Sequence, residues 1–156
     1  WMFSNTSDQL DGPELSDEET RAQVVEPVKR IVRTAGLQDV TGSFRFDSCN
    51  DQTEPPFRGV AGVRFAFPPD VDPDAYIEEL TRLMIADGWS PGPPPALQPY
   101  GNVVHRGQMM AFVDPHPDMP GHGLIEVRGD CRNLTDQLKA EGTVPQSITE
   151  ELRAAN

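Results

Sequence analysis

Basic residues are scarce in this sequence. Lysine and arginine together number 13, against 25 aspartates and glutamates, and the formal net charge is −12. A nucleic-acid groove needs clustered Lys and Arg to replace the counterions of the phosphates, and no basic run occurs here. We therefore expect no nucleic-acid partner. Unaided docking on an anionic membrane surface is disfavoured for the same reason.

Long apolar runs and familiar catalytic motifs are also missing. No stretch of about 18 or more apolar residues occurs, which excludes a membrane-spanning helix within this sequence. We expect membrane association only through an N-terminal anchor that is not present in this chain. The sequence contains no GxSxG nucleophile turn, no GxGxxG and no GxxxxGK[ST] phosphate loop, and we expect no cofactor.

What the sequence does contain favours a single domain. Its 156 residues are enough to enclose a hydrophobic core. Residues 1–15 are acidic and broken by glycine and proline, which predicts a flexible tail or tether. We assign residues 16–136 to one α+β domain and residues 137–156 to a weakly helical C-terminal tail.

Helical signatures occur at residues 16–36 and 72–88. Ser16 and Glu19 have the spacing of a capping box, and apolar residues follow at helical intervals. Pro27 lies inside this pattern and predicts a kink or a late helix start. Alternating patterns predict strands at 40–49, 57–67, 102–107, 108–115 and 123–131.

The order of these elements predicts the architecture. It is a helix, two strands, a second helix and three further strands. No strand–helix–strand alternation runs long enough for a doubly wound parallel sheet. We therefore predict an α+β two-layer sandwich, in which an antiparallel sheet of about five strands carries the two main helices on one face.

Two cysteines, Cys49 and Cys131, each lie at the C-terminal end of a predicted strand. Three roles are open: a nucleophile, a metal ligand or one half of a disulfide. Their spacing excludes a CxxC motif, and no local motif marks a nucleophile. Two cysteines allow one intramolecular pairing, and closing so long a loop restricts the unfolded chain by roughly 4 kcal/mol. We favour the disulfide, which implies an oxidising compartment.

A weak candidate metal cluster lies in the stretch "DPHPDMPGH". Its oxygen and nitrogen ligands would be Asp114, His116, Asp118 and His122. Their spacing matches no established zinc signature, and the three prolines explain the stretch equally well as a stiff surface loop. We therefore predict no metal site.

Several stretches together resemble a known group of proteins. They are "SCNDQTEPPFRG", an apolar strand, "DPDAYIEELTRLMIADGW", a proline-rich turn and a late "GDCRN". These resemble small actinobacterial cell-envelope lipoproteins and secreted proteins, with the mycobacterial LppA-like group as the nearest. The resemblance implies an exported helix-plus-sheet domain that is lipid-anchored or tethered, with Cys49 and Cys131 paired. It brings no known activity.

We therefore predict an exported, non-enzymatic domain, tethered to the outer face of the plasma membrane, that binds a protein, lipid or glycan component of the envelope. Loops on a rigid sheet often carry recognition, and the expected surface combines loops 50–58, 91–99 and 115–120. Its predicted contact residues are Phe57, Arg58, Pro93, Pro94, Pro95 and Tyr100. The alternative is a hydrolase that depends on Cys49 or on a metal bound at 114–122.

Overall fold

The computed structural model describes residues 10–50, 52–95 and 102–155. Its helices are α1 (Asp17–Ala35), α2 (Pro73–Ala86) and α3 (Thr149–Ala155). Its strands are β1 (Gln38–Ser48), β2 (Phe57–Ala66), β3 (Ser90–Pro91), β4 (Val103–Arg106), β5 (Met109–Pro115), β6 (His122–Arg128) and β7 (Gln146–Ser147).

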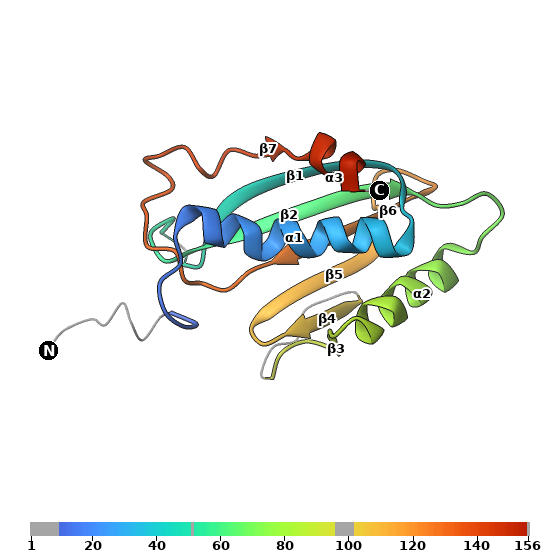
Figure 1. Cartoon of the computed structure of the whole chain (residues 1–156), viewed down its shortest axis with the longest axis horizontal. Helices are drawn as coiled ribbons and strands as arrows, with labels where there is room; N and C mark the ends of the chain where they lie inside the picture. The colour runs from blue at the N-terminus through green and yellow to red at the C-terminus, as the bar shows by residue number, and fades with distance from the viewer. Residues whose placement is uncertain (1–9, 51, 96–101, 156) are drawn as a thin grey trace, which may run out of the picture.

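All strands join one antiparallel sheet in the order β3-β4-β5-β6-β2-β1-β7 (Figure 1). The predicted α+β class and antiparallel sheet are confirmed. The sheet has seven strands instead of about five, because the two-residue strands β3 and β7 extend its two edges. Such short edge strands leave little unpaired backbone to attract another chain.

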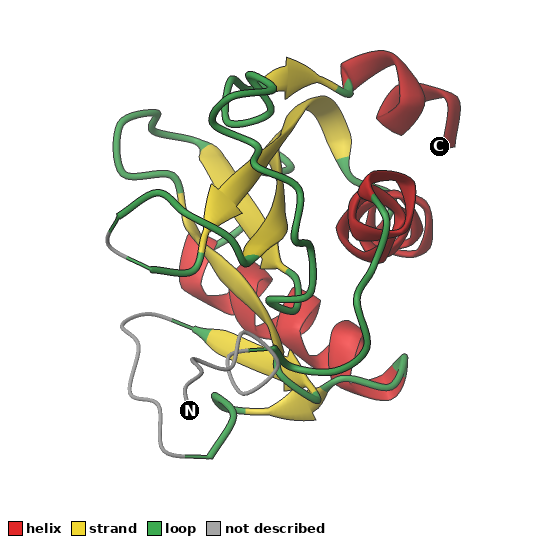
Figure 2. Ribbon diagram, turned by 90° about the vertical axis from the view of Figure 1, so that its left-hand side faces the viewer, coloured by secondary structure: helices red, strands yellow, loops and turns green. Residues whose placement is uncertain are grey.

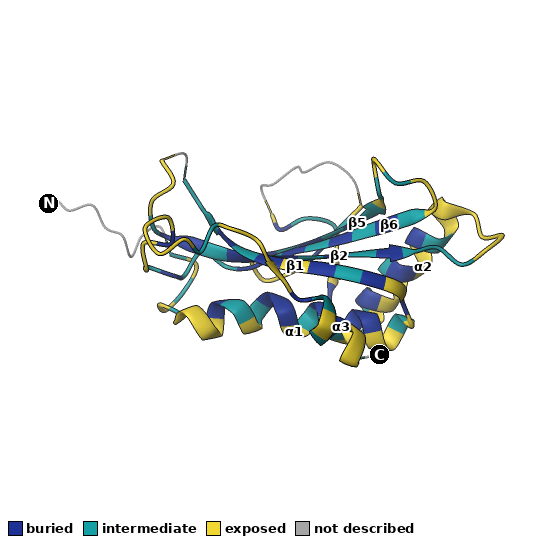
Figure 3. Cartoon of the chain, turned by 90° about the horizontal axis from the view of Figure 1, so that it is seen from above, coloured by how far each residue is buried: buried dark blue, intermediate teal, exposed yellow. Residues whose placement is uncertain are grey.

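The helices lie on one side of the sheet, as Figure 3 shows, and Figure 2 shows α1 nearly end-on beside the strands. Side chains alternate along a strand, so every second residue faces the helices. On β2 these are Phe57, Gly59, Ala61, Val63 and Phe65, all of them buried. Within the described residues, the opposite face of the sheet carries no helix.

Helix α1 begins where its sequence predicts. The hydroxyl of Ser16 accepts a hydrogen bond from the Glu19 amide at 3.0 Å, and the Glu19 carboxylate accepts one from the Ser16 amide at 2.9 Å. The predicted late start at Pro27 does not occur. Val24 and Val28, on either side of the proline, are fully buried, and this burial outweighs the backbone hydrogen bond that a proline lacks.

Both chain ends of the described part belong to the domain. The 137–156 region is not a tail, since β7 pairs with Ser43 and Phe44, and Ile148 and Leu152 are buried in the core. The amide of Leu15 donates to the Arg132 carbonyl at 2.7 Å, which fixes the chain before α1. Burial of two aliphatic side chains provides the driving force that weak helix propensity does not. The expectation for residues 1–9 lies outside the described residues.

Candidate functional site

The open face of the sheet brings together polar residues from four strands. The pairing register places Ser43, Gly62, Glu126 and Phe112 in one row across β1, β2, β6 and β5. A neighbouring row holds Thr41, Arg64, Leu124 and Asp114. These side chains point away from the helices and are half-buried or exposed. They lie on the face of the sheet that no described helix covers.

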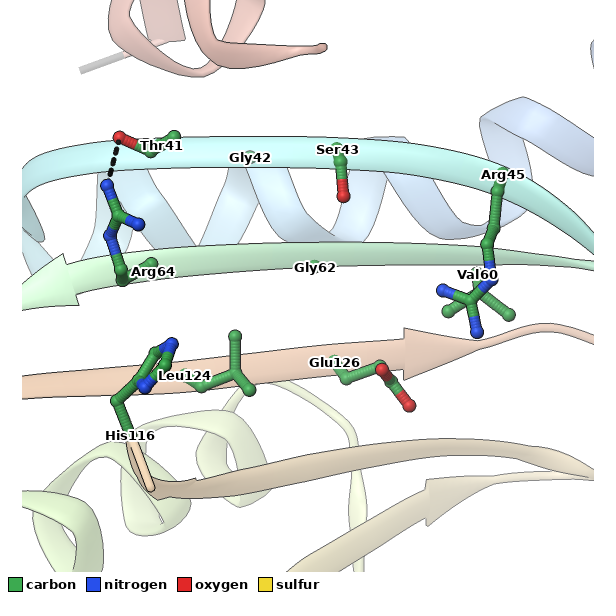
Figure 4. Close-up of a pocket in the computed structure, with 10 residues that line it drawn as sticks. All are labelled: Thr41, Gly42, Ser43, Arg45, Val60, Gly62, Arg64, His116, Leu124 and Glu126. Atoms are coloured by element: carbon green, nitrogen blue, oxygen red, sulfur yellow. Dashed lines mark hydrogen bonds between the residues drawn. The ribbon is translucent and has the colours of Figure 1, made fainter. Parts of the chain in front are cut away.

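A hollow of about 270 Å³ opens on this face, and we call it the arginine hollow (Figure 4). Its walls are formed by Thr41, Gly42, Ser43, Arg45, Val60, Gly62, Arg64, His116, Leu124 and Glu126. Figure 4 shows Arg45 and Ser43 directed from β1 toward β2, with Arg64 at the other end of the hollow. The hollow therefore combines two guanidinium groups, an imidazole, two hydroxyls and the carboxylate of Glu126.

The two arginines differ in how they are held. The Nη2 of Arg64 donates to the Thr41 hydroxyl at 3.3 Å, and its Nε is buried without a hydrogen-bond partner among the described residues. Arg45 forms no hydrogen bond or ion pair with any described residue. An unmade hydrogen bond at a buried donor costs roughly 1–3 kcal/mol. Both guanidinium groups therefore have unused capacity to bind a partner.

A second hollow of about 310 Å³ adjoins the first and is mainly apolar. This apolar hollow is formed by Phe112, Asp114, Pro115, Pro117, Leu124 and Glu126. Leu124 and Glu126 line both hollows. Arg128 donates from Nε to Oε2 of Glu126 at 2.8 Å and lies 4.9 Å from the centre of the Phe112 ring. The one acidic side chain shared by the hollows is thus neutralised by its own partner.

The predicted binding residues do not form one surface. Phe57 is fully buried, so its ring is unavailable to a partner, and it pairs through its backbone with Asn133. Arg58 is half-buried on the open face, 3.4 Å from Asp47. Pro93 is half-buried, Pro94 buried and Pro95 exposed near edge strand β3, while Tyr100 lies outside the described residues. Of the three predicted loops, 115–120 lines the hollows, through His116 and Pro117.

The two cysteines form a disulfide. Cys49 and Cys131 are bonded with their Cα atoms 6.2 Å apart, which joins the end of β1 to the segment after β6. The amide of Cys131 also donates to Oδ2 of Asp11 at 2.8 Å. A bonded sulfur is not a thiolate, so Cys49 in this state lacks the nucleophile that a Cys-dependent hydrolase needs.

The weak metal candidates lie at the end of the β5–β6 hairpin. Three of their side chains contact nearby backbone groups instead. Oδ1 of Asp114 accepts from the Asn102 amide at 3.1 Å, and Nδ1 of His116 accepts from the Asp118 amide at 3.0 Å. Nδ1 of His122 lies 3.2 Å from the Pro120 carbonyl. Among the described residues, no three His, Cys, Asp or Glu side chains are grouped to hold a metal ion.

Sequence reasoning overlooked the residues of the arginine hollow. Arg45 lies in an alternating strand on the face opposite Phe44 and Phe46, and Arg64 alternates with Val63 and Phe65 in the same way. This alternation in the sequence already indicates that both arginines lie on the polar face of their strands. Glycines inside a strand, as in "RGVAGVRF", more often mark a bulge or close packing than a ligand. Close packing does not apply to Gly62, because a Cβ added there would meet a single atom within 4 Å, at 3.6 Å.

Comparison with known proteins identifies relatives along most of the chain. A profile of the family described as "Putative lipoprotein LppJ" matches residues 16–151. Proteins of that description from Mycobacterium tuberculosis (strain CDC 1551 / Oshkosh) and Mycobacterium bovis are each 40% identical over 138 residues, which is 88% of this chain and 71% of theirs. No solved structure matches.

The described part of the chain contains no helix that is both long and apolar enough to cross a membrane. The resemblance to actinobacterial lipoproteins, carried by the contexts of the two cysteines, is confirmed. The match spans the complete sheet, the disulfide and the arginine hollow. This chain is therefore a member of the LppJ lipoprotein family.

Proposed function

We propose that this protein is a non-enzymatic binding domain of the cell envelope, and that it holds an envelope component on the open face of its sheet. The observation that carries the proposal is the pair of adjoining hollows on the helix-free face, one lined by arginines and one apolar. Binding sites commonly combine an apolar wall with a few polar groups that fix the orientation of the ligand.

The construction of this face supports binding. Its residues lie on β1, β2, β5 and β6, whose other faces form the buried core, so the backbone beneath the hollows is firmly held. Sites built on strands keep their geometry better than sites built on loops. A ligand would therefore find the surface largely preformed, with little ordering cost on binding.

Family membership supports the location. Proteins described as lipoproteins are held at a membrane by a lipid, and the disulfide fits an oxidising, extracytoplasmic compartment. Asp11 and Leu15 are bonded to the Cys131–Arg132 segment. A tether that enters the domain through residue 11 would therefore approach the disulfide end of the sheet and leave the open face accessible.

The test uses a matched pair of leucine variants. Leu124→Gln changes the residue shared by both hollows, while Leu83→Gln changes a leucine on α2 that is 40% exposed. Immobilised, disulfide-bonded protein is exposed to detergent-solubilised mycobacterial envelope, and the retained lipids, glycans and proteins are identified by mass spectrometry. We expect one component to be retained by wild type and Leu83→Gln and lost from Leu124→Gln. Retention that does not differ among the three proteins, or none at all, contradicts the proposal.

A further inference from the structure

We infer that the arginine hollow binds an oxyanion group, a phosphate or a carboxylate, carried by a molecule whose apolar part occupies the apolar hollow. This inference rests on the proposed open-face site and specifies the chemistry of its ligand. Arg45 and Arg64 would hold the anion, with Thr41, Ser43 and His116 around them. Guanidinium groups bind oxyanions through parallel, charge-assisted hydrogen bonds.

The distribution of charge favours an anion at this hollow. Acidic residues outnumber basic ones by 25 to 13 in this chain, so most cations find a carboxylate. Arg21, Lys29, Arg30, Arg58, Arg82, Arg128 and Arg132 all form ion pairs. The other six, Arg33, Arg45, Arg64, Arg106, Lys139 and Arg153, form none with any described residue, and of these Arg45 and Arg64 line the arginine hollow together. Two uncompensated cations in so acidic a protein create a local attraction for an anion.

The hydrogen bonding of Arg64 is incomplete among the described residues. Its Nη2 bond to Thr41 holds the side chain against β1, while its Nε is buried and has no partner in the described part of the chain. A small rotation of the guanidinium toward a ligand oxygen would give this donor a partner. A ligand oxygen there would satisfy a buried donor that no described residue satisfies, and part of the arginine is already positioned for it.

Gly62 forms the floor of the hollow between the arginines (Figure 4). A glycine inside a strand lowers stability, so its presence needs a reason. At Gly42 and Gly59 the reason is packing, since an added Cβ would lie 2.4 Å from Leu152 Cδ1 and 2.9 Å from the Thr20 carbonyl oxygen. At Gly62 the nearest atom would be the Ile125 carbonyl oxygen, at an ordinary 3.6 Å. Packing does not require this glycine, whereas a space for ligand does.

The apolar hollow determines the rest of the ligand. Phe112, Pro117 and Leu124 continue the surface beyond Glu126, whose carboxylate is bonded to Arg128. An anion with an attached apolar group would bury this surface and gain roughly 25 cal/mol for each Å² of apolar area removed from water. We therefore assign an amphiphilic anion to the site in preference to a free one.

The experiment titrates the intact, disulfide-bonded protein with octyl phosphate below its micelle concentration and with inorganic phosphate, by calorimetry at low salt. We expect octyl phosphate to bind more tightly than inorganic phosphate. The double variant Arg45→Gln/Arg64→Gln should bind octyl phosphate at least about tenfold more weakly. Gly62→Val should weaken it similarly by filling the floor, and valine suits a strand, so this variant should fold.

The matched control is Arg58→Gln, because Arg58 lies on the same face but pairs with Asp47 outside the hollow. Its affinity should stay within about twofold of wild type. Equal loss in Arg58→Gln and the double variant would mean unspecific charge attraction and overturn the inference. Equal affinity of wild type for the two phosphates would overturn its amphiphile part.

A further measurement separates two sources of the phosphate group, a membrane lipid and a soluble molecule. Vesicles of phosphatidylglycerol should sediment with wild type but not with the double variant, and phosphatidylcholine vesicles should sediment with neither. If wild type binds no oxyanion, yet Leu124→Gln alone loses an envelope component, the oxyanion inference is wrong and the proposed open-face function stands.

Discussion

Arg21 of α1 and Glu151 of α3 form a bidentate ion pair, although they are 130 residues apart in the sequence. Nη1 of Arg21 donates to Oε1 of Glu151 at 3.3 Å, and Nη2 donates to Oε2. The pair attaches the last helix to the first one on the helical side of the sheet. It supplements the burial of Ile148 and Leu152, which brings the C-terminal region into the domain.

This ion pair predicts a pH dependence of stability. The hydrogen bond and the charge of Arg21 lower the pKa of Glu151 below its ordinary value of 4.5, against a smaller opposing effect of desolvation. Because the folded pKa is lower than the unfolded one, the contribution is complete above pH 4.5 and is lost as the pH falls through the folded pKa. Both side chains are more than a third exposed, so we expect at most about 1 kcal/mol.

Urea unfolding of wild type and Glu151→Gln checks this expectation. Wild type should have the larger free energy of unfolding at neutral pH, and the gap should begin to close below pH 4.5. Glu150→Gln makes the same charge change one residue earlier, at an exposed position. A gap that is independent of pH, or equal for both variants, would contradict the role assigned to Arg21.

The disulfide predicts a large loss of stability on its removal. The Cys49–Cys131 bond spans 82 positions, and in the chain-entropy model such a crosslink stabilises by about 4 kcal/mol. The double variant Cys49→Ser/Cys131→Ser should lose that amount in denaturant unfolding, and wild type in reductant should match it. Alkylation of unfolded, unreduced protein should add no label. Two added labels on protein from an oxidising compartment would refute the pairing.

The glycines of β1 and β2 predict opposite effects of the same substitution. Gly42→Ala would press its Cβ against Leu152 and the Gly62 carbonyl oxygen, and we expect a loss of about 1–3 kcal/mol from overpacking. Gly62→Ala meets only an ordinary contact and should gain about 0.5–1 kcal/mol. Thermal and urea unfolding would compare them. A comparable loss in both variants would mean that Gly62 has a packing role and would weaken its assignment to the ligand site.

The helices and main strands could be predicted from the sequence because their signals are local. The capping box of Ser16 and Glu19 and the Asp72 cap before Pro73 depend on residues within one turn. The alternation in β2 likewise reflects which of its own residues are apolar. Of the two expectations for Pro27, a kink or a late start, the late start is wrong, because the neighbouring valines gain more from the core, which lies far away in sequence, than the local proline costs.

The C-terminal region also depends on contacts that are distant in sequence. Its seven-residue helix has little stability of its own, and sequence reasoning therefore predicted a tail. Ile148 and Leu152 become core residues because β7 pairs with β1, a contact between segments about 100 residues apart by the register of Ser43 with Ser147. The stability of such a short helix depends on the residues it packs against more than on its intrinsic helix propensity.

The proposed binding surface also depends partly on local sequence and partly on tertiary structure. The sequence by itself determined that strands with one apolar and one polar face would form, that two helices would cover the apolar face, and that Cys49 and Cys131 had one intramolecular pairing available. Only the tertiary structure decided that Arg45, Gly62, Arg64 and His116 line one hollow, and that Phe57 is buried instead of exposed. Periodicity specifies the face on which a residue lies, whereas the strand order and register that specify its neighbours arise from long-range pairing across the complete core.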